Sequence, residues 1–104
     1  MVFGKFTERA QIVLVEAQKE SQYFKHGYIG TEHILLGILK EGGFANRVLY
    51  ISGITIDKVR NLIEDYLGFG DVDISIGEML LNPRTKIVFD DSLAKAMMYN
   101  HNYI

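Results

Sequence analysis

The spacing of hydrophobic residues predicts helices along most of the chain. In the first segment, small and apolar residues fall at three- and four-residue steps with charged residues between them, which is typical of a helix with one buried face. Glycines and capping residues mark the ends of further segments of this kind. Four helices are therefore expected: from Thr7, a predicted N-cap, to about Phe24; from Thr31, also a predicted N-cap, to the Gly42 and Gly43 pair; from Phe44 to Ile51; and from Thr55 to Gly68.

A fifth helix is expected after a polar connector at about residues 69–81. Asn82 followed by Pro83 is a strong start signal, because Asn caps helices and Pro lacks only an amide hydrogen that the first turn does not use. This helix is expected from Pro83 to about Tyr99. The alternation of Val72, Ile74 and Ile76 is the only weak sign of a strand, and a loop is favoured there. The predicted fold class is all-α.

The chain also repeats itself at a constant offset, which indicates a duplicated supersecondary unit. The first copy of the matching residues is Arg9, Ile12, Val13, His26, Tyr28 and Ile29, and the second is Arg84, Ile87, Val88, His101, Tyr103 and Ile104. We therefore predict one complete four-helix repeat at about residues 5–68 and the first helix of a second repeat at residues 82–104. On this interpretation the chain is a fragment of a longer protein.

Composition excludes several classes of function. The hydrophobic fraction of 48% and the charged fraction of 23% indicate a folded domain, because disorder needs the opposite balance. The net charge of −2 gives no general attraction to phosphate backbones, so no nucleic-acid partner is expected. No stretch has the apolar length of a membrane span or of a signal core, so no membrane partner is expected and a cytoplasmic location is predicted.

No residue pattern indicates catalysis or a metal. Gly37 and Gly42 have P-loop spacing, but Gly43 and Phe44 follow in place of the Lys and Ser or Thr that contact phosphate and magnesium. The serines lie in no nucleophile motif. His33 has no second ligand one helical turn away, so metal binding is not expected, and the histidines are predicted to bond to loop carbonyls.

Three helix starts are candidate anion sites, because the first turn of a helix presents unpaired amide hydrogens and a partial positive charge. They lie at Thr7, Thr31 and Asn82. Beside them, an exposed carboxylate on Glu32 could accept a guanidinium in a two-bond fork. From the pattern alone, simple helix capping by these residues is favoured over ligand binding.

Two segments resemble a known family closely. Residues 3–10, Phe-Gly-Lys-Phe-Thr-Glu-Arg-Ala, and residues 26–37, His-Gly-Tyr-Ile-Gly-Thr-Glu-His-Ile-Leu-Leu-Gly, are similar to the N-terminal domain of Clp AAA+ unfoldases of the ClpC class. The resemblance implies an all-helical domain of two four-helix repeats on an ATP-driven ring that unfolds proteins and threads them into a Clp peptidase. ATP and magnesium would belong to the ATPase domains of such a parent, so this chain is expected to need no cofactor and to catalyse no reaction.

The resemblance further implies binding of adaptor proteins and of substrates, including proteins tagged with phosphoarginine. Glu32 would take the guanidinium, and amides and hydroxyls near Thr7 and Thr31, with Arg84 or Lys86, would hold the phosphate. The complete set of predicted binding residues is Thr7, Arg9, Thr31, Glu32, Asn82, Arg84 and Lys86.

The chain departs from the family in one respect. The second-repeat counterpart of Glu32 would lie three residues beyond Ile104, so any binding is expected to use one pocket only. The apolar side of the Pro83–Tyr99 helix would lack its cover, which predicts self-association or exchange of that helix between two copies. The alternative to an unfoldase module is a free-standing helical interaction protein built from the same repeat.

Overall fold

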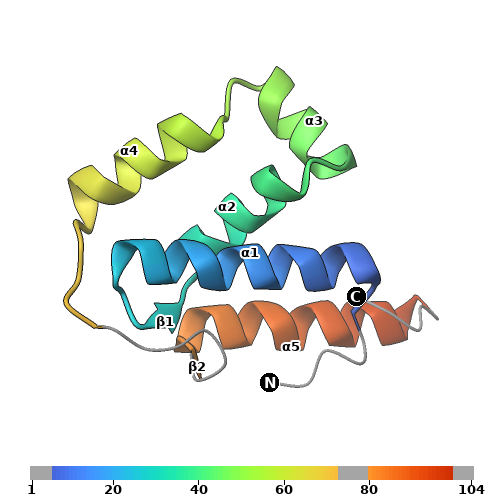
Figure 1. Cartoon of the computed structure of the whole chain (residues 1–104). Coiled ribbons are helices and arrows are strands. Elements are labelled where there is room, and N and C mark those ends of the chain that lie inside the picture. Colours follow the sequence, from blue (N-terminus) through green and yellow to red (C-terminus); the bar gives the residue numbers. More distant parts are fainter. Residues whose placement is uncertain (1–5, 73–79, 100–104) are drawn as a thin grey trace.

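The computed structural model describes residues 6–72 and 80–99. In that part of the chain, five helices and two very short strands follow one another in the order shown in Figure 1: α1 (Glu8–Phe24), β1 (Tyr28–Ile29), α2 (Thr31–Glu41), α3 (Phe44–Ile51), α4 (Ile56–Tyr66), β2 (Leu80–Leu81) and α5 (Pro83–Met98). The predicted all-α class is therefore confirmed. Val72 lies in a loop, as expected, whereas Ile74 and Ile76 fall outside the described residues. The limits of the two repeats remain a prediction.

Three of the helix starts are capped by the side chain that the sequence predicts or allows. The hydroxyl of Thr7 accepts from the amide of Ala10 at 3.2 Å, and the carbonyl of the Asn82 side chain accepts from the amide of Thr85 at 2.9 Å. Thr55 caps α4 in the same way. These contacts satisfy amides that the first turn of a helix cannot pair internally.

The prediction that Thr31 caps the second helix is wrong. Gly30 occupies the N-cap position, and Thr31 is the first helical residue. A side-chain cap is not needed here because the imidazole of His33 reaches back and accepts from the amide of Gly30 at 2.8 Å. This is the role that Glu or Gln plays at the same position of a capping box.

Close packing of α1 against α2 forms the centre of the molecule. A Cβ atom placed on Gly37 of α2 would collide with the backbone carbonyl of Val13 in α1, so the two backbones approach more closely there than a side chain permits. Residues from α1, α2 and α4 then enclose the largest buried cluster, which consists of Phe24, Leu36, Leu39, Val59 and Ile63. Burial of these side chains supplies the main driving force for folding.

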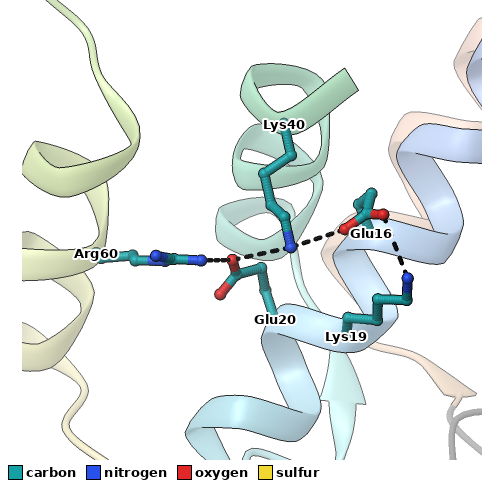
Figure 2. A network of polar contacts seen from close by, with 5 residues as sticks. All are labelled: Glu16, Lys19, Glu20, Lys40 and Arg60. Carbon is teal, nitrogen blue, oxygen red and sulfur yellow. Dashed lines mark hydrogen bonds and ion pairs between the residues drawn. The ribbon is translucent and has the colours of Figure 1, made fainter. Parts of the chain in front are cut away.

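A polar network joins the same three helices (Figure 2). The Glu20 side chain of α1 is only 2% exposed, and its Oε1 pairs with Arg60 of α4 and, at 3.4 Å, with Lys40 of α2. Lys40 also lies 2.7 Å from Glu16, and this hydrogen bond lowers the pKa of the Glu16 carboxyl against the opposing effect of burial. The hydrogen bond from Arg60 to Glu20 raises the pKa of the guanidinium. Because both cations are shared with α1, the network fixes the relative positions of the helices.

The two short strands bring distant parts of the chain together. Tyr28 pairs with Leu80 and Ile29 pairs with Leu81 in parallel, and the amide of Asn82 donates to the carbonyl of Ile29 at 3.0 Å. Each strand leads directly into a helix, β1 into α2 and β2 into α5, and the parallel pairing makes both helices begin at the same edge (Figure 1). The starts of α2 and α5 are therefore close to each other.

Candidate functional site

The adjacent first turns of α2 and α5 form the candidate site. Both present amides that the helix itself leaves unpaired, and both carry the partial positive charge of a helix N-terminus. Thr31 and Glu32 come from α2, while Asn82, Arg84 and Lys86 come from α5. Thr31 is partly buried, and the side chains of Arg84 and Lys86 are exposed. Five of the seven predicted binding residues are thus grouped by the strand pair.

Thr7 and Arg9 do not join this site. They lie at the start of α1, and Arg9 binds Glu41 at the last residue of α2 with a distance of 2.9 Å between Nη1 and Oε1. At 1.5 Å per residue, the 11 residues of α2 separate this end from Thr31 by about 15 Å. The prediction that Thr7 and Thr31 act on one phosphate is therefore wrong, because α1 and α2 begin at opposite ends of the packed pair.

The sequence predicts an exposed carboxylate on Glu32, but this carboxylate is partly buried. Its side chain is 23% exposed and folds back over Gly30, where a Cβ atom would collide with the carboxylate. It also lies against Tyr28, whose hydroxyl pKa is raised by burial and further by the charge and hydrogen bonding of Glu32. The absence of a side chain on Gly30 thus creates the space that this carboxylate occupies.

A pair of histidines lies directly beneath Glu32. Nδ1 of His26 is 2.8 Å from Nε2 of His33, and Nε2 of His26 is 2.7 Å from the carbonyl oxygen of Gly68 at the end of α4. Burial lowers the pKa of His33 to about 4; the charge of His26 acts in the same direction and the nearby Glu32 and Glu20 carboxylates oppose it. His33 is therefore a neutral imidazole at pH 7.

Sequence reasoning treated His33 as isolated and missed this pair. The predicted bond from His26 to a loop carbonyl is confirmed, while His101 lies outside the described residues. His26, Tyr28 and Gly30 are absent from the predicted site, although all three shape the surroundings of Glu32. The recurrence of His26 and Tyr28 in the second repeat was the available signal for their importance.

One atom each from His26, Glu32 and His33 could approach a common metal ion, since their ligand atoms lie within 4.8 Å of one another. The 2.8 Å between the two ring nitrogens is the length of a hydrogen bond, and the remaining ring nitrogens bond to Gly30 and Gly68. Hydrogen bonding thus accounts for the positions of both imidazoles. The expectation that no metal binds here stays a prediction.

A second feature of the surface is the exposed apolar face of α5, on which Ile87 is 61% exposed and Met97 is 69% exposed. Val88 and Phe89 lie on the other side of α5 and line a groove of about 260 Å³ between α5 and the α1–α2 pair. The ring of Phe6 meets that of Phe89 at 5.4 Å at this groove. None of the described helices is long and apolar enough to cross a membrane.

Comparison with known proteins identifies the family. The profile of the Clp repeat (R) N-terminal domain matches residues 5–104. The chain belongs to this family. It is 43% identical to the ATP-dependent Clp protease ATP-binding subunit ClpC of Staphylococcus epidermidis, and to that of Staphylococcus aureus, over 105 aligned residues. In both cases the alignment covers 100% of this chain and 13% of the relative, so the chain spans about an eighth of the length of these Clp proteins.

The Clp-repeat fold is also found among solved structures. The crystal structure of the N-terminal domain of the caseinolytic protease associated chaperone ClpD from Arabidopsis thaliana matches with a TM-score of 0.80 and 30% sequence identity. The match covers 100% of this chain and 71% of that domain. The helical architecture described above is therefore that of a Clp N-terminal domain.

Proposed function

We propose that this chain recognises adaptor and substrate proteins for an ATP-dependent Clp unfoldase and that it reads phosphoarginine. Membership of the Clp repeat family supports the first part of the proposal. The observation that carries the second part is the convergence of two helix N-termini beside one carboxylate, at Thr31, Asn82 and Glu32. No catalytic role is proposed for the chain, and ATP hydrolysis and proteolysis would belong to other parts of such an assembly.

The charges of the site match the two parts of a phosphoarginine side chain. A phosphoryl group is an anion, and the first-turn amides that capping does not use, those of Thr31 and Glu32 in α2 and of Arg84 in α5, offer it donors. The side chains of Arg84 and Lys86 add positive charge. A guanidinium is a planar cation, and the carboxylate of Glu32 can accept two parallel hydrogen bonds from it. The proposal leaves out Thr7 and Arg9, because they lie at the opposite end of α2.

Replacement of the carboxylate tests this assignment. We expect Glu32→Gln to weaken the binding of free phosphoarginine by about tenfold or more, because a hydrogen bond to a charged group contributes about 1.5–3 kcal/mol. Titration calorimetry on the two proteins measures the change. Glu64→Gln, at an exposed position of α4 far along the chain from the site, is the matched control and should bind like the wild type. Equal affinity of Glu32→Gln and wild type would reject the role of Glu32.

The apolar face of α5 supports a second proposal, in which two copies of this chain associate through the Pro83–Tyr99 segment. Exposed apolar patches of this kind commonly bind another protein. We expect the mass measured by analytical ultracentrifugation to rise with concentration, and we expect Ile87→Lys to suppress the rise. Asn61→Lys, which adds the same charge at an exposed position on α4, should leave the association intact. A monomeric mass for the wild type at high concentration would contradict this proposal.

A further inference from the structure

His33 and His26 form a series of three hydrogen bonds between the amide of Gly30 and the carbonyl of Gly68. Only one assignment of donors and acceptors fits all three bonds. The amide of Gly30 can only donate, so Nδ1 of His33 must accept and the proton of this neutral ring must be on Nε2. That proton is donated to Nδ1 of His26, and the proton of His26 must then be on Nε2, from which it is donated to the carbonyl of Gly68. A backbone donor at one end and a backbone acceptor at the other thus fix both tautomers.

Whether Nδ1 of His33 carries a proton determines whether this nitrogen can donate a hydrogen bond to Glu32. Such a bond would compete with a ligand for the Glu32 carboxylate. Oε1 of Glu32 lies 3.8 Å from this nitrogen, which carries no proton while the chain of bonds is intact. A proton on Nδ1 would face the amide of Gly30 and could be donated to Glu32 instead. The other titratable groups that act on the pair are Tyr28, whose ring lies 5.4 Å from that of His33, and Glu20.

We propose that His26 and His33 are positioning residues of the recognition site, which keep Glu32 available to a guanidinium by holding His33 in the tautomer that bears its proton on Nε2. This inference rests on the proposed function for the identity of the ligand. Removal of the acceptor on His26 leaves the Nε2 proton of His33 without a partner, so that the tautomer with its proton on Nδ1, which can donate to Glu32, competes with the native one. Protonation of His33 places a proton on Nδ1 directly. The bond to Gly30 is then lost, and His33 competes with the ligand for Glu32. Anchoring through Gly68 connects this arrangement to the end of α4.

Two variants at position 26 separate positioning from general stability. His26→Leu removes the acceptor but keeps an apolar side chain against the ring of Phe24, which stacks on His26 at 5.3 Å. His26→Gln keeps a side-chain acceptor and donor and cannot titrate. Long-range nitrogen-15 NMR of the imidazoles reports the tautomer of His33, and calorimetry with free phosphoarginine reports binding. Both are measured at about pH 7.5, where an unperturbed imidazole is neutral.

We expect wild-type His33 to carry its proton on Nε2, and we expect His26→Leu to move this proton to Nδ1 and to weaken phosphoarginine binding by about tenfold. His26→Gln should restore both observables, with binding within about twofold of the wild type. A wild-type protein with the proton on Nδ1 would overturn the inference, as would unchanged binding in a folded His26→Leu variant that shows the altered tautomer. A wild-type proton on Nδ1 overturns the inference even where His26→Leu does not fold, and a proton that stays on Nε2 in a folded His26→Leu variant overturns it as well.

The two proposals fail in different ways. If the wild type does not bind phosphoarginine, the proposed function is rejected, and the tautomer of His33 together with the chemical shift of the Glu32 carboxyl in the His26 variants still tests the positioning effect. That shift should move on His26→Leu and return on His26→Gln. If the chemical shift of the Glu32 carboxyl does not change when the tautomer of His33 changes, the proposal that the histidines position Glu32 is rejected, whatever the ligand.

Discussion

Acidification is expected to remove about 3 kcal/mol of stability through His33 alone. The pKa of this side chain is about 4 in the folded protein, because burial disfavours the imidazolium, and about 6.5 in an unfolded chain. Between about pH 4 and about pH 6.5, the imidazole of His33 is protonated in the unfolded chain and neutral in the folded protein. Stability is therefore fully present above about pH 6.5, falls as the pH is lowered and has lost the whole contribution below about pH 4.

Chemical denaturation across this pH range measures the effect, and His33→Gln is the matched variant. Gln at this position can still accept from the amide of Gly30, as in a capping box, but it does not titrate. Carboxylates such as Glu16, whose pKa is lowered by Lys40, add their own acid dependence to both proteins. The difference between the two profiles isolates His33. Parallel profiles from about pH 7 to about pH 4 would show that His33 is not held neutral in the folded state.

Gly37→Ala should destabilise the domain by about 1–3 kcal/mol, even though Ala favours a helix more than Gly does. The new Cβ atom would meet the backbone carbonyl of Val13, and backbone cannot move aside as a flexible side chain can. The α1–α2 pair must then separate, which loosens the packing around Leu36 and Leu39. Thermal and denaturant unfolding of the two proteins provide the measurement.

Gly43→Ala is the control for this prediction. A Cβ atom on Gly43 would also be crowded, but by the ends of the Glu41 and Arg9 side chains, which can move away at little cost. We expect a loss of about 1 kcal/mol or less there, because Ala is a poorer N-cap than Gly but no backbone atom has to move. Similar losses at positions 37 and 43 would show that the close approach to Val13 does not limit stability.

The sequence anticipated the helices because their signals are local. An amphipathic spacing of three and four residues, an Asn-Pro start at Asn82 and the glycines that follow α2, α3 and α4 need only neighbours along the chain, and the five helices of the described residues follow such signals. The start of α2 is the exception. Thr31 has the right chemistry for an N-cap, but His33 satisfies the amide of Gly30 first. A reach-back bond from a histidine is not part of the usual capping signal.

The composition of the candidate site was only partly predictable. Glu32 and the residues around Asn82 were selected from helix starts and from the family resemblance, and the pairing of β1 with β2 brings the starts of α2 and α5 close to each other. Thr7 was selected by the same reasoning and lies elsewhere, because a capping motif carries no information about which other helix start will be its neighbour. The two-residue strands that decide this are too short to produce an alternating pattern.

Local sequence signals and the family resemblance establish that this protein is a set of amphipathic helices of the Clp repeat type, with helix starts able to bind an anion and one acidic residue, Glu32, beside them. Contacts across the fold establish that α2 and α5 begin at the same edge, that Thr7 and Arg9 lie away from it, and that His26 and His33 lie next to Glu32. The physical reason is that periodicity and capping depend on residues within a few positions of each other. Strand pairing, the close contact at Gly37 and the proton placement on His33 depend on contacts between residues far apart in the chain.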